Sequence, residues 1–228
     1  RRQLRQPLIW ILLLLLGFML WGLSKGNVRI GTGDTSVGGK KAFITSEFAN
    51  AQLQALIVFM MYTFFVAVAA GMSVIRDEEL KVGELIHSTQ LRPGEYIWGK
   101  YLAIVSVFLG VLSFHIALSI TFNHLFSDPA AVKYLGPFAI GNYLRPALIF
   151  ALPTLLFVSG TTFAVGAITR KPILVFALPI AALLGTGFFL WDWSPSWLDP
   201  SIDSALMLIE PAGFRWLNET WLKVDRGV

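Results

Sequence analysis

Five long apolar segments, none of which contains Asp, Glu, Lys or Arg, constrain the fold of this chain more than any other feature. The hydrocarbon core of a bilayer is about 30 Å thick, so a helix needs about 20 apolar residues to cross it. The segments cover residues 8–23, 51–75, 101–122, 147–168 and 172–191. We therefore expect an all-α polytopic membrane protein with five visible membrane-spanning helices.

The overall composition agrees with this class. Hydrophobic residues make up 55% of the 228 residues and charged residues only 14%, whereas soluble domains average about 25% charged residues. Cysteine is absent, which excludes a disulfide framework and a thiolate metal site. The first apolar segment follows three arginines, as in a signal peptide, but it is longer than the usual signal-peptide core. We interpret it as an uncleaved first span.

The positive charges predict the orientation in the membrane. If the N-terminus is cytoplasmic, the inner segments are 1–7, 76–100 and 169–171. The 18 Lys and Arg residues divide equally between these segments and the outer ones, although the outer ones are together more than twice as long. Lys and Arg are enriched in short cytoplasmic loops. We therefore expect a multi-pass protein of the inner (plasma) membrane with a cytoplasmic N-terminus.

Two outer segments have their own patterns. The stretch GNVRIGTGDTSVGGKK in the first outer segment is rich in glycine, but Gly31-Thr32-Gly33 lacks the third glycine of a dinucleotide-binding fingerprint, so we predict a flexible loop. Residues 192–228 alternate tryptophans with short apolar stretches. Because tryptophan prefers the headgroup level of a bilayer, we expect this segment to form amphipathic helices on the outer membrane surface.

The spans contain few polar groups. Transporters driven by protons or Na⁺ usually carry charged side chains near the bilayer midplane, and the five apolar segments have none. His115 is their only ionisable group apart from tyrosines, and Ser159, Thr161 and Thr162 form a hydroxyl-rich stretch. These four residues are candidates for lining a substrate path. The alternative is structural, since a lone histidine is more often hydrogen-bonded within the protein and small hydroxyl residues support close helix packing.

The stretch RPGEYIWGKY comes close to a phosphate-binding loop. Gly94 and Gly99-Lys100 have the right spacing, but Tyr101 occupies the position of the Ser or Thr that binds Mg²⁺, and no strand precedes the motif. We interpret Lys100 as a lysine that snorkels to water from the inner end of the third span. No hydrolase motif is present either. We predict that this chain is not an enzyme and binds no cofactor or metal, so that any energy source must be another chain.

Residues 76–96 are unusual for a loop between two spans. Val82, Leu85 and Ile86 follow the i, i+3, i+4 spacing of an amphipathic helix, and Arg92-Pro93-Gly94 would end that helix. Its acidic residues fit an anionic leaflet poorly. We therefore interpret the segment as a dock for a cytoplasmic protein, with a helix lying on lipid as the alternative.

The same segment resembles a known family. Arg76-Asp77, Glu79, Glu84-Leu85-Ile86, Ser88-Thr89, Arg92, Tyr96 and Gly99-Lys100 are similar to the cytoplasmic coupling segment of type-2 ABC exporter permeases. The departures are Lys81, Val82 and Gln90, where the family has Gly, Thr and Pro. The stretches RRQLRQPLIW, VRIG and EPAGFRWLNETW resemble the branch that is joined to, or encoded with, a zinc aminopeptidase.

The resemblance implies that residues 1–228 are an ABC type-2 transmembrane domain, the permease of an ATP-driven exporter. Such a permease has six spans, pairs with a second copy as a homo- or heterodimer, and docks on an ABC ATPase subunit that binds ATP and Mg²⁺. The residues to which it assigns coupling are Arg76, Asp77, Glu79, Glu84, Leu85, Ile86, Ser88, Thr89 and Arg92.

We expect the chain to be incomplete at both ends, with a sixth span and any peptidase portion beyond Val228. Its other expected partners are membrane lipids and a peptidase domain or subunit, and we expect no nucleic acid. Two alternative functions stay open. One is a membrane anchor or scaffold for a peptidase, and the other is a membrane-embedded enzyme with a polar site around His115, Asn123 and His124.

Overall fold

The computed structural model describes residues 7–32, 35–38, 44–80, 92–126, 135–187, 197 and 199–217. Its α-helices are α1 (Pro7–Ser24), α2 (Glu47–Ile57), α3 (Thr63–Glu79), α5 (Pro93–Ile120), α6 (Gly141–Pro146), α7 (Leu152–Thr169), α8 (Pro172–Gly185) and α9 (Pro200–Ile209). The π-helical turns are η2 (Val58–Tyr62), η3 (Thr121–Leu125) and η5 (Ala147–Ala151). The strands are β1 (Arg29–Thr32) and β2 (Thr35–Gly38).

The π-helical turns continue the helices beside them rather than ending them. Among the described residues, four helices are therefore long and apolar enough to cross a membrane: Pro7–Ser24, Glu47–Asp77, Gly94–Leu125 and Gly141–Thr169. They contain the first four predicted spans, and they confirm an all-α polytopic membrane protein. The fifth predicted span, 172–191, begins with the shorter apolar helix α8 and runs past the described residues, so it stays a prediction.

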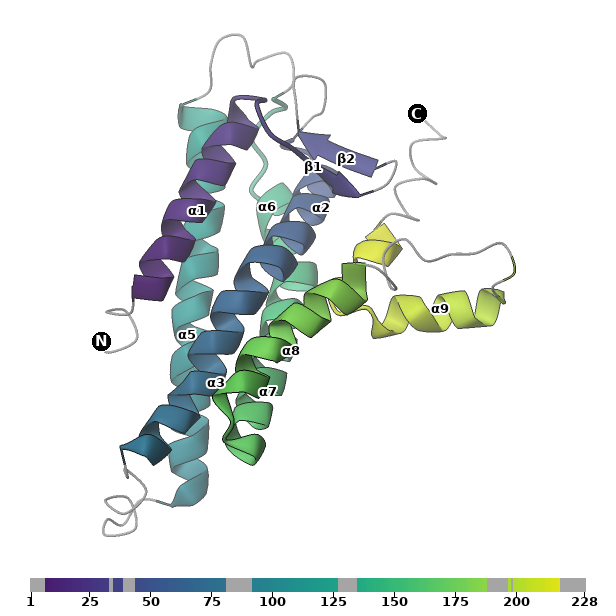
Figure 1. The fold of residues 1–228 in the computed structure, drawn as a ribbon. Coiled ribbons are helices and arrows are strands. Elements are labelled where there is room, and N and C mark those ends of the chain that lie inside the picture. The colour runs from purple at the N-terminus through teal and green to yellow at the C-terminus, as the bar shows by residue number, and fades with distance from the viewer. Residues whose placement is uncertain are drawn as a thin grey trace.

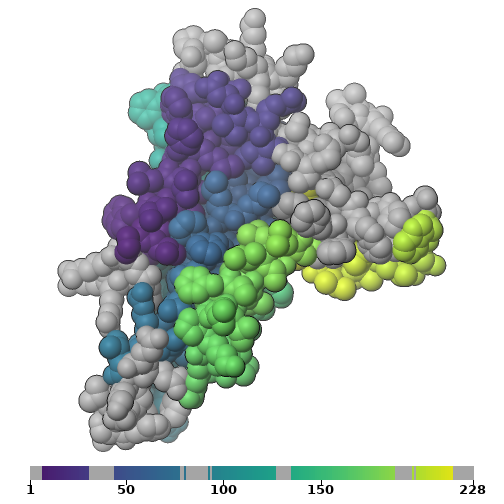
Figure 2. Space-filling view, viewed as in Figure 1, coloured from purple at the N-terminus to yellow at the C-terminus, as the bar shows by residue number. Residues whose placement is uncertain are grey.

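The helices lie side by side, with the α3–α5 and α7–α8 connections at one end of the bundle (Figure 1). We call this end the inner end, because it carries the segments predicted to be cytoplasmic. Helix α3 packs mainly on α7 and α8, while α1 packs on α5. Figure 2 shows α3 between α1 and α8 on one face of the molecule. The main core is apolar, with Leu12, Leu16 and Val66 fully buried.

Small residues let the backbones of α3 and α7 approach closely near the inner end. A Cβ atom added to Gly166 would lie 2.8 Å from the carbonyl oxygen of Gly71, and one added to Gly71 would lie 2.3 Å from a methyl group of Val175 on α8. Helices in a membrane gain no hydrophobic drive from association, so close packing of this kind is a main source of their attraction. Glycine at 71 and 166 therefore sets how α3, α7 and α8 pack.

The prediction of a flexible glycine-rich loop after the first span is wrong for part of that segment. Strands β1 and β2 form an antiparallel hairpin with Arg29 opposite Gly38 and Ile30 opposite Val37. The signal was a Gly-Asp dipeptide, residues 33 and 34, between two short runs that include β-branched residues. Glycine content alone did not indicate a loop, because a two-residue connection between strands favours glycine.

The segment after α8 contains one described amphipathic helix. Helix α9 projects from the bundle (Figure 1) and exposes Ile202, Leu208 and Ile209. Arg215, which is buried, forms an ion pair with Asp203 of α9, and neighbouring residues 212–217 pack on α2 through a second apolar cluster. The helix agrees with the sequence pattern, while its position on the outer membrane surface stays a prediction.

Candidate functional site

The structure describes the residues on both sides of the predicted coupling helix, but not the residues between them. Residues 81–91 lie outside the described residues, and with them the predicted site residues Glu84, Leu85, Ile86, Ser88 and Thr89; the side chain of Glu79 is not described either. The flanking residues are placed. Arg76 and Asp77 lie in the last turns of α3, and Arg92 directly precedes α5.

Helix α5 begins with a defined cap. Pro93 is its first residue, a position where the missing N–H of proline costs no hydrogen bond. The backbone N–H of Arg92 donates to the Glu95 carboxylate at 3.2 Å. The Arg92-Pro93-Gly94 sequence therefore starts the next span as well as following the predicted coupling helix. Gly94 and Gly99 both lie within α5, so this stretch does not have the strand–loop–helix form of a phosphate-binding loop.

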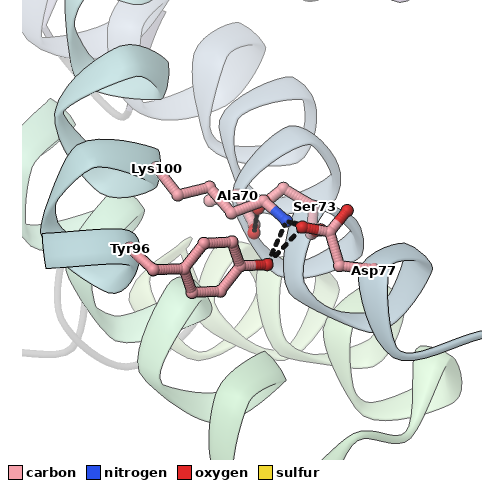
Figure 3. Close-up of polar contacts among 5 residues, drawn as sticks. All are labelled: Ala70, Ser73, Asp77, Tyr96 and Lys100. Atoms are coloured by element: carbon pink, nitrogen blue, oxygen red, sulfur yellow. Dashed lines mark hydrogen bonds and ion pairs between the residues drawn. The ribbon is translucent and has the colours of Figure 1, made fainter. Parts of the chain in front are cut away.

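A cluster of polar side chains joins the inner ends of α3 and α5 (Figure 3). Lys100 forms an ion pair with Asp77 and donates to the carbonyl oxygen of Ser73. The Tyr96 hydroxyl donates to the same Asp77 carboxylate oxygen and lies 3.1 Å from the Lys100 Nζ. We call Ser73, Asp77, Tyr96 and Lys100 the α3–α5 clamp.

Helix geometry explains why these four residues meet. Tyr96 and Lys100 are four residues apart on α5, and Ser73 and Asp77 are four apart on α3. Residues with this spacing lie on the same face of a helix. Each helix thus presents two clamp residues to the other, and the Lys100 ammonium contacts acceptors of Ser73, Asp77 and Tyr96.

The clamp changes the interpretation of Lys100. Its side chain is only 15% exposed and that of Asp77 only 24%, so the predicted snorkelling of Lys100 to water is wrong. The physical reason is the position of Asp77. Removing an ammonium from water costs free energy, and the carboxylate, carbonyl and hydroxyl across the helix interface offset that cost.

The four candidate residues for a substrate path are placed but not brought together. His115 is 2% exposed, and its Nδ1 lies 3.2 Å from the hydroxyl of Tyr62 in η2. Ser159, on α7, is buried, with its Oγ 3.3 Å from the Tyr101 hydroxyl. Tyr101 and His115 are on one helix and differ by 14 residues, so at 1.5 Å per residue the two contacts are separated by about 21 Å.

The hydroxyls of the threonines point back along their own helix. Thr161 donates to the carbonyl oxygen of Phe157 at 2.8 Å, and Thr162 to that of Val158 at 2.6 Å. These bonds satisfy both hydroxyls without a ligand, as is common for threonine within helices. A role of these residues in a substrate path stays a prediction.

A second polar group lies near the outer end. Asn123 and His124 were predicted from the sequence to form a polar site with His115, whereas Tyr143 and Gln54 were not predicted to take part. The Tyr143 hydroxyl lies 2.9 Å from a ring nitrogen of His124 and accepts from the Asn123 amide at 3.3 Å. Gln54 donates to the backbone oxygen of Tyr143 at 3.0 Å. The sequence signal for Gln54 was the presence of a glutamine inside an otherwise apolar segment. Asn123 and His124 belong to the π-helical turn η3, a feature that often occurs at functional sites.

A cleft of about 290 Å³ lies between α1, α3 and α8. Its walls are mostly apolar, and the polar residues that line it are Ser73 and Arg76 of α3. The cleft therefore borders the clamp and the predicted coupling residues at the inner end, whereas His115, Ser159, Thr161 and Thr162 do not line it.

The long apolar helices define a multi-pass membrane protein. Residues 35–209, more than half of the chain, match the family described as ABC-2 family transporter protein. The chain therefore belongs to the ABC-2 family of transporter proteins and is a membrane permease, a transport subunit of an ABC transporter. Membership implies association with an ABC ATPase subunit and dimerisation. No curated protein and no solved structure matches the chain.

Proposed function

We propose that this permease belongs to an ATP-driven exporter and that its ATPase docks on residues 76–96. The observation that carries the proposal is the α3–α5 clamp, which ties together the two helix ends from which this segment leaves the bundle. The other described connection at the inner end is too short for a dock. Helix α7 ends at Thr169 and α8 begins at Pro172, which leaves Arg170 and Lys171 between them.

The basic residues at this end support a cytoplasmic location for it. Arg76, Arg92, Arg170 and Lys171 all lie at or beside the inner ends of helices, and their side chains are largely exposed. Such residues are enriched on the cytoplasmic side of membrane proteins. The dock would then face the compartment that holds ATP, and ATP and Mg²⁺ would bind to the partner ATPase rather than to this chain.

The apolar interior suits a lipid-linked, peptide or amphipathic substrate, since the predicted spans hold no charged residue to pair with a small ion. The family match does not distinguish between branches of the family. The peptidase partner, the choice between homodimer and heterodimer, and the plasma-membrane location therefore remain predictions.

The test is to disrupt the predicted dock. Glu84→Arg and Leu85→Asp should release the ATPase or uncouple its hydrolysis, because burial of one leucine-sized side chain contributes about 1.5–3 kcal/mol and a reversed charge meets a like charge. The measurements are the amount of ATPase recovered per permease and the ATP hydrolysis of each complex.

Lys133→Glu, in a predicted outer segment, is the matched control and should retain the native values. The lipid-lying alternative predicts that Glu84→Arg is neutral or strengthens membrane attachment. Native ATPase recovery and native hydrolysis in both dock variants would contradict the proposal.

A further inference from the structure

We propose that the α3–α5 clamp is a positioning device for coupling: it makes the inner ends of α3 and α5 move as one body when the ATPase moves the segment between them. The inference rests on the proposed function, in which the ATPase docks on residues 76–96. Under this proposal the clamp residues do not touch ATP or substrate. They act by fixing the geometry of the two helix ends.

The first argument is the position of the clamp. Asp77 lies two residues before the end of α3, and Lys100 lies seven residues after the first residue of α5. At 1.5 Å per residue, both are within about 10 Å of the helix ends along the helix axes. A displacement of the connecting segment therefore reaches the clamp before it reaches the membrane-spanning parts of either helix.

The second argument is that α3 and α5 make few direct contacts with each other, although both pack on α7. Helix α3 packs mainly on α7 and α8, and its contacts with α5 are few. Without the clamp, a push on the connecting segment could spread the two ends apart instead of moving them together. The clamp joins directly two helix ends that otherwise meet mainly through α7, so that they move together.

The third argument is the chemistry of the link. An exposed ion pair contributes little and loosens with salt, but this pair is mostly shielded from water. The Tyr96 hydroxyl and the Ser73 carbonyl add directional hydrogen bonds to the same two charged groups. Several bonds that converge from two helices restrict rotation as well as distance, which a single ion pair does not.

The experiment measures the distance between the two helix ends in the assembled complex. The chain has no native cysteine, so spin labels can be attached at Leu80 after α3 and Ile97 on α5, both of which are exposed. We expect one narrow distance distribution that is the same without nucleotide and with ATP plus vanadate. In Asp77→Asn, which removes the charge but keeps the shape, we expect a wider distribution that changes with nucleotide.

Two further variants test whether the effect comes from loss of the ion pair itself, rather than from the residue at either position or from misfolding. The charge exchange Asp77→Lys with Lys100→Asp should restore a narrow distribution, and Tyr96→Phe, which keeps the ion pair, should widen it less than Asp77→Asn. The matched control is Glu47→Gln. It removes the exposed Glu47–Arg145 pair elsewhere in the bundle and should leave the labelled distance unchanged.

The outcomes also distinguish this inference from the proposed function. Lys100→Gln breaks the same ion pair at a residue outside the predicted dock, so it should keep the native amount of bound ATPase and widen the distance distribution as Asp77→Asn does. A narrow, nucleotide-independent distance in Asp77→Asn, or a nucleotide-dependent distance in the native chain, would overturn the positioning role. Failure of the native chain to bind any ATPase would instead overturn the proposed function.

Discussion

Replacing Gly166 by alanine should loosen the contact that holds α3, α7 and α8 together. The added Cβ would lie 2.8 Å from the carbonyl oxygen of Gly71 and 2.9 Å from its Cα. Both neighbours are backbone atoms, so they cannot move aside by a change of rotamer. The helices must separate, and overpacking of this kind typically costs about 1–3 kcal/mol.

The matched control is Gly160→Ala on the same helix. The nearest atom to an added Cβ there is the Tyr101 hydroxyl, at an ordinary 3.5 Å. Both substitutions gain the helix propensity of alanine over glycine, about 0.8–1.0 kcal/mol, and this term cancels when the two variants are compared. Gly166→Ala should therefore be less stable than Gly160→Ala by about 1–3 kcal/mol.

The assay is thermal unfolding of the purified chain in one detergent, with native, Gly160→Ala and Gly166→Ala samples side by side. Equal unfolding temperatures for the two variants would refute the reasoning. A second pair sharpens the test. Gly71→Ala meets the Val175 side chain rather than backbone, so Val175→Ala should recover part of its loss, as expected for residues in direct contact.

Two further predictions use the buried polar groups and the topology. Tyr62→Phe should destabilise the chain by about 1–3 kcal/mol, because it leaves the buried Nδ1 of His115 without its partner; an unchanged unfolding temperature would show that this bond contributes nothing. Cysteines introduced at Gly33 and Ser196 should react with an impermeant thiol reagent on intact cells, and one at Ser88 only after permeabilisation. Labelling of the cysteine at position 88 on intact cells would contradict the predicted orientation.

The sequence determined the class of this protein because the signals involved are local. Crossing a bilayer depends on the transfer free energy of about 20 consecutive residues, and four of the five uninterrupted apolar segments lie inside the long apolar helices of the described residues. The coupling-segment pattern beginning at Arg76 and Asp77 likewise identified a permease of the family that the chain matches.

Only the tertiary structure decided which side chains meet. Asp77 and Lys100 are 23 residues apart in the chain, and no residue pattern predicts that they pair rather than that Lys100 turns toward water. The same holds for Gly71 with Gly166, and for Tyr62 with His115. A continuous apolar segment specifies that a helix forms but not which of its faces is buried, since Leu12 and Leu16 are buried while Leu14 and Phe18 are exposed. The partner of a buried charge depends on how neighbouring helices are rotated and shifted, which is fixed by packing of residues far apart in the chain.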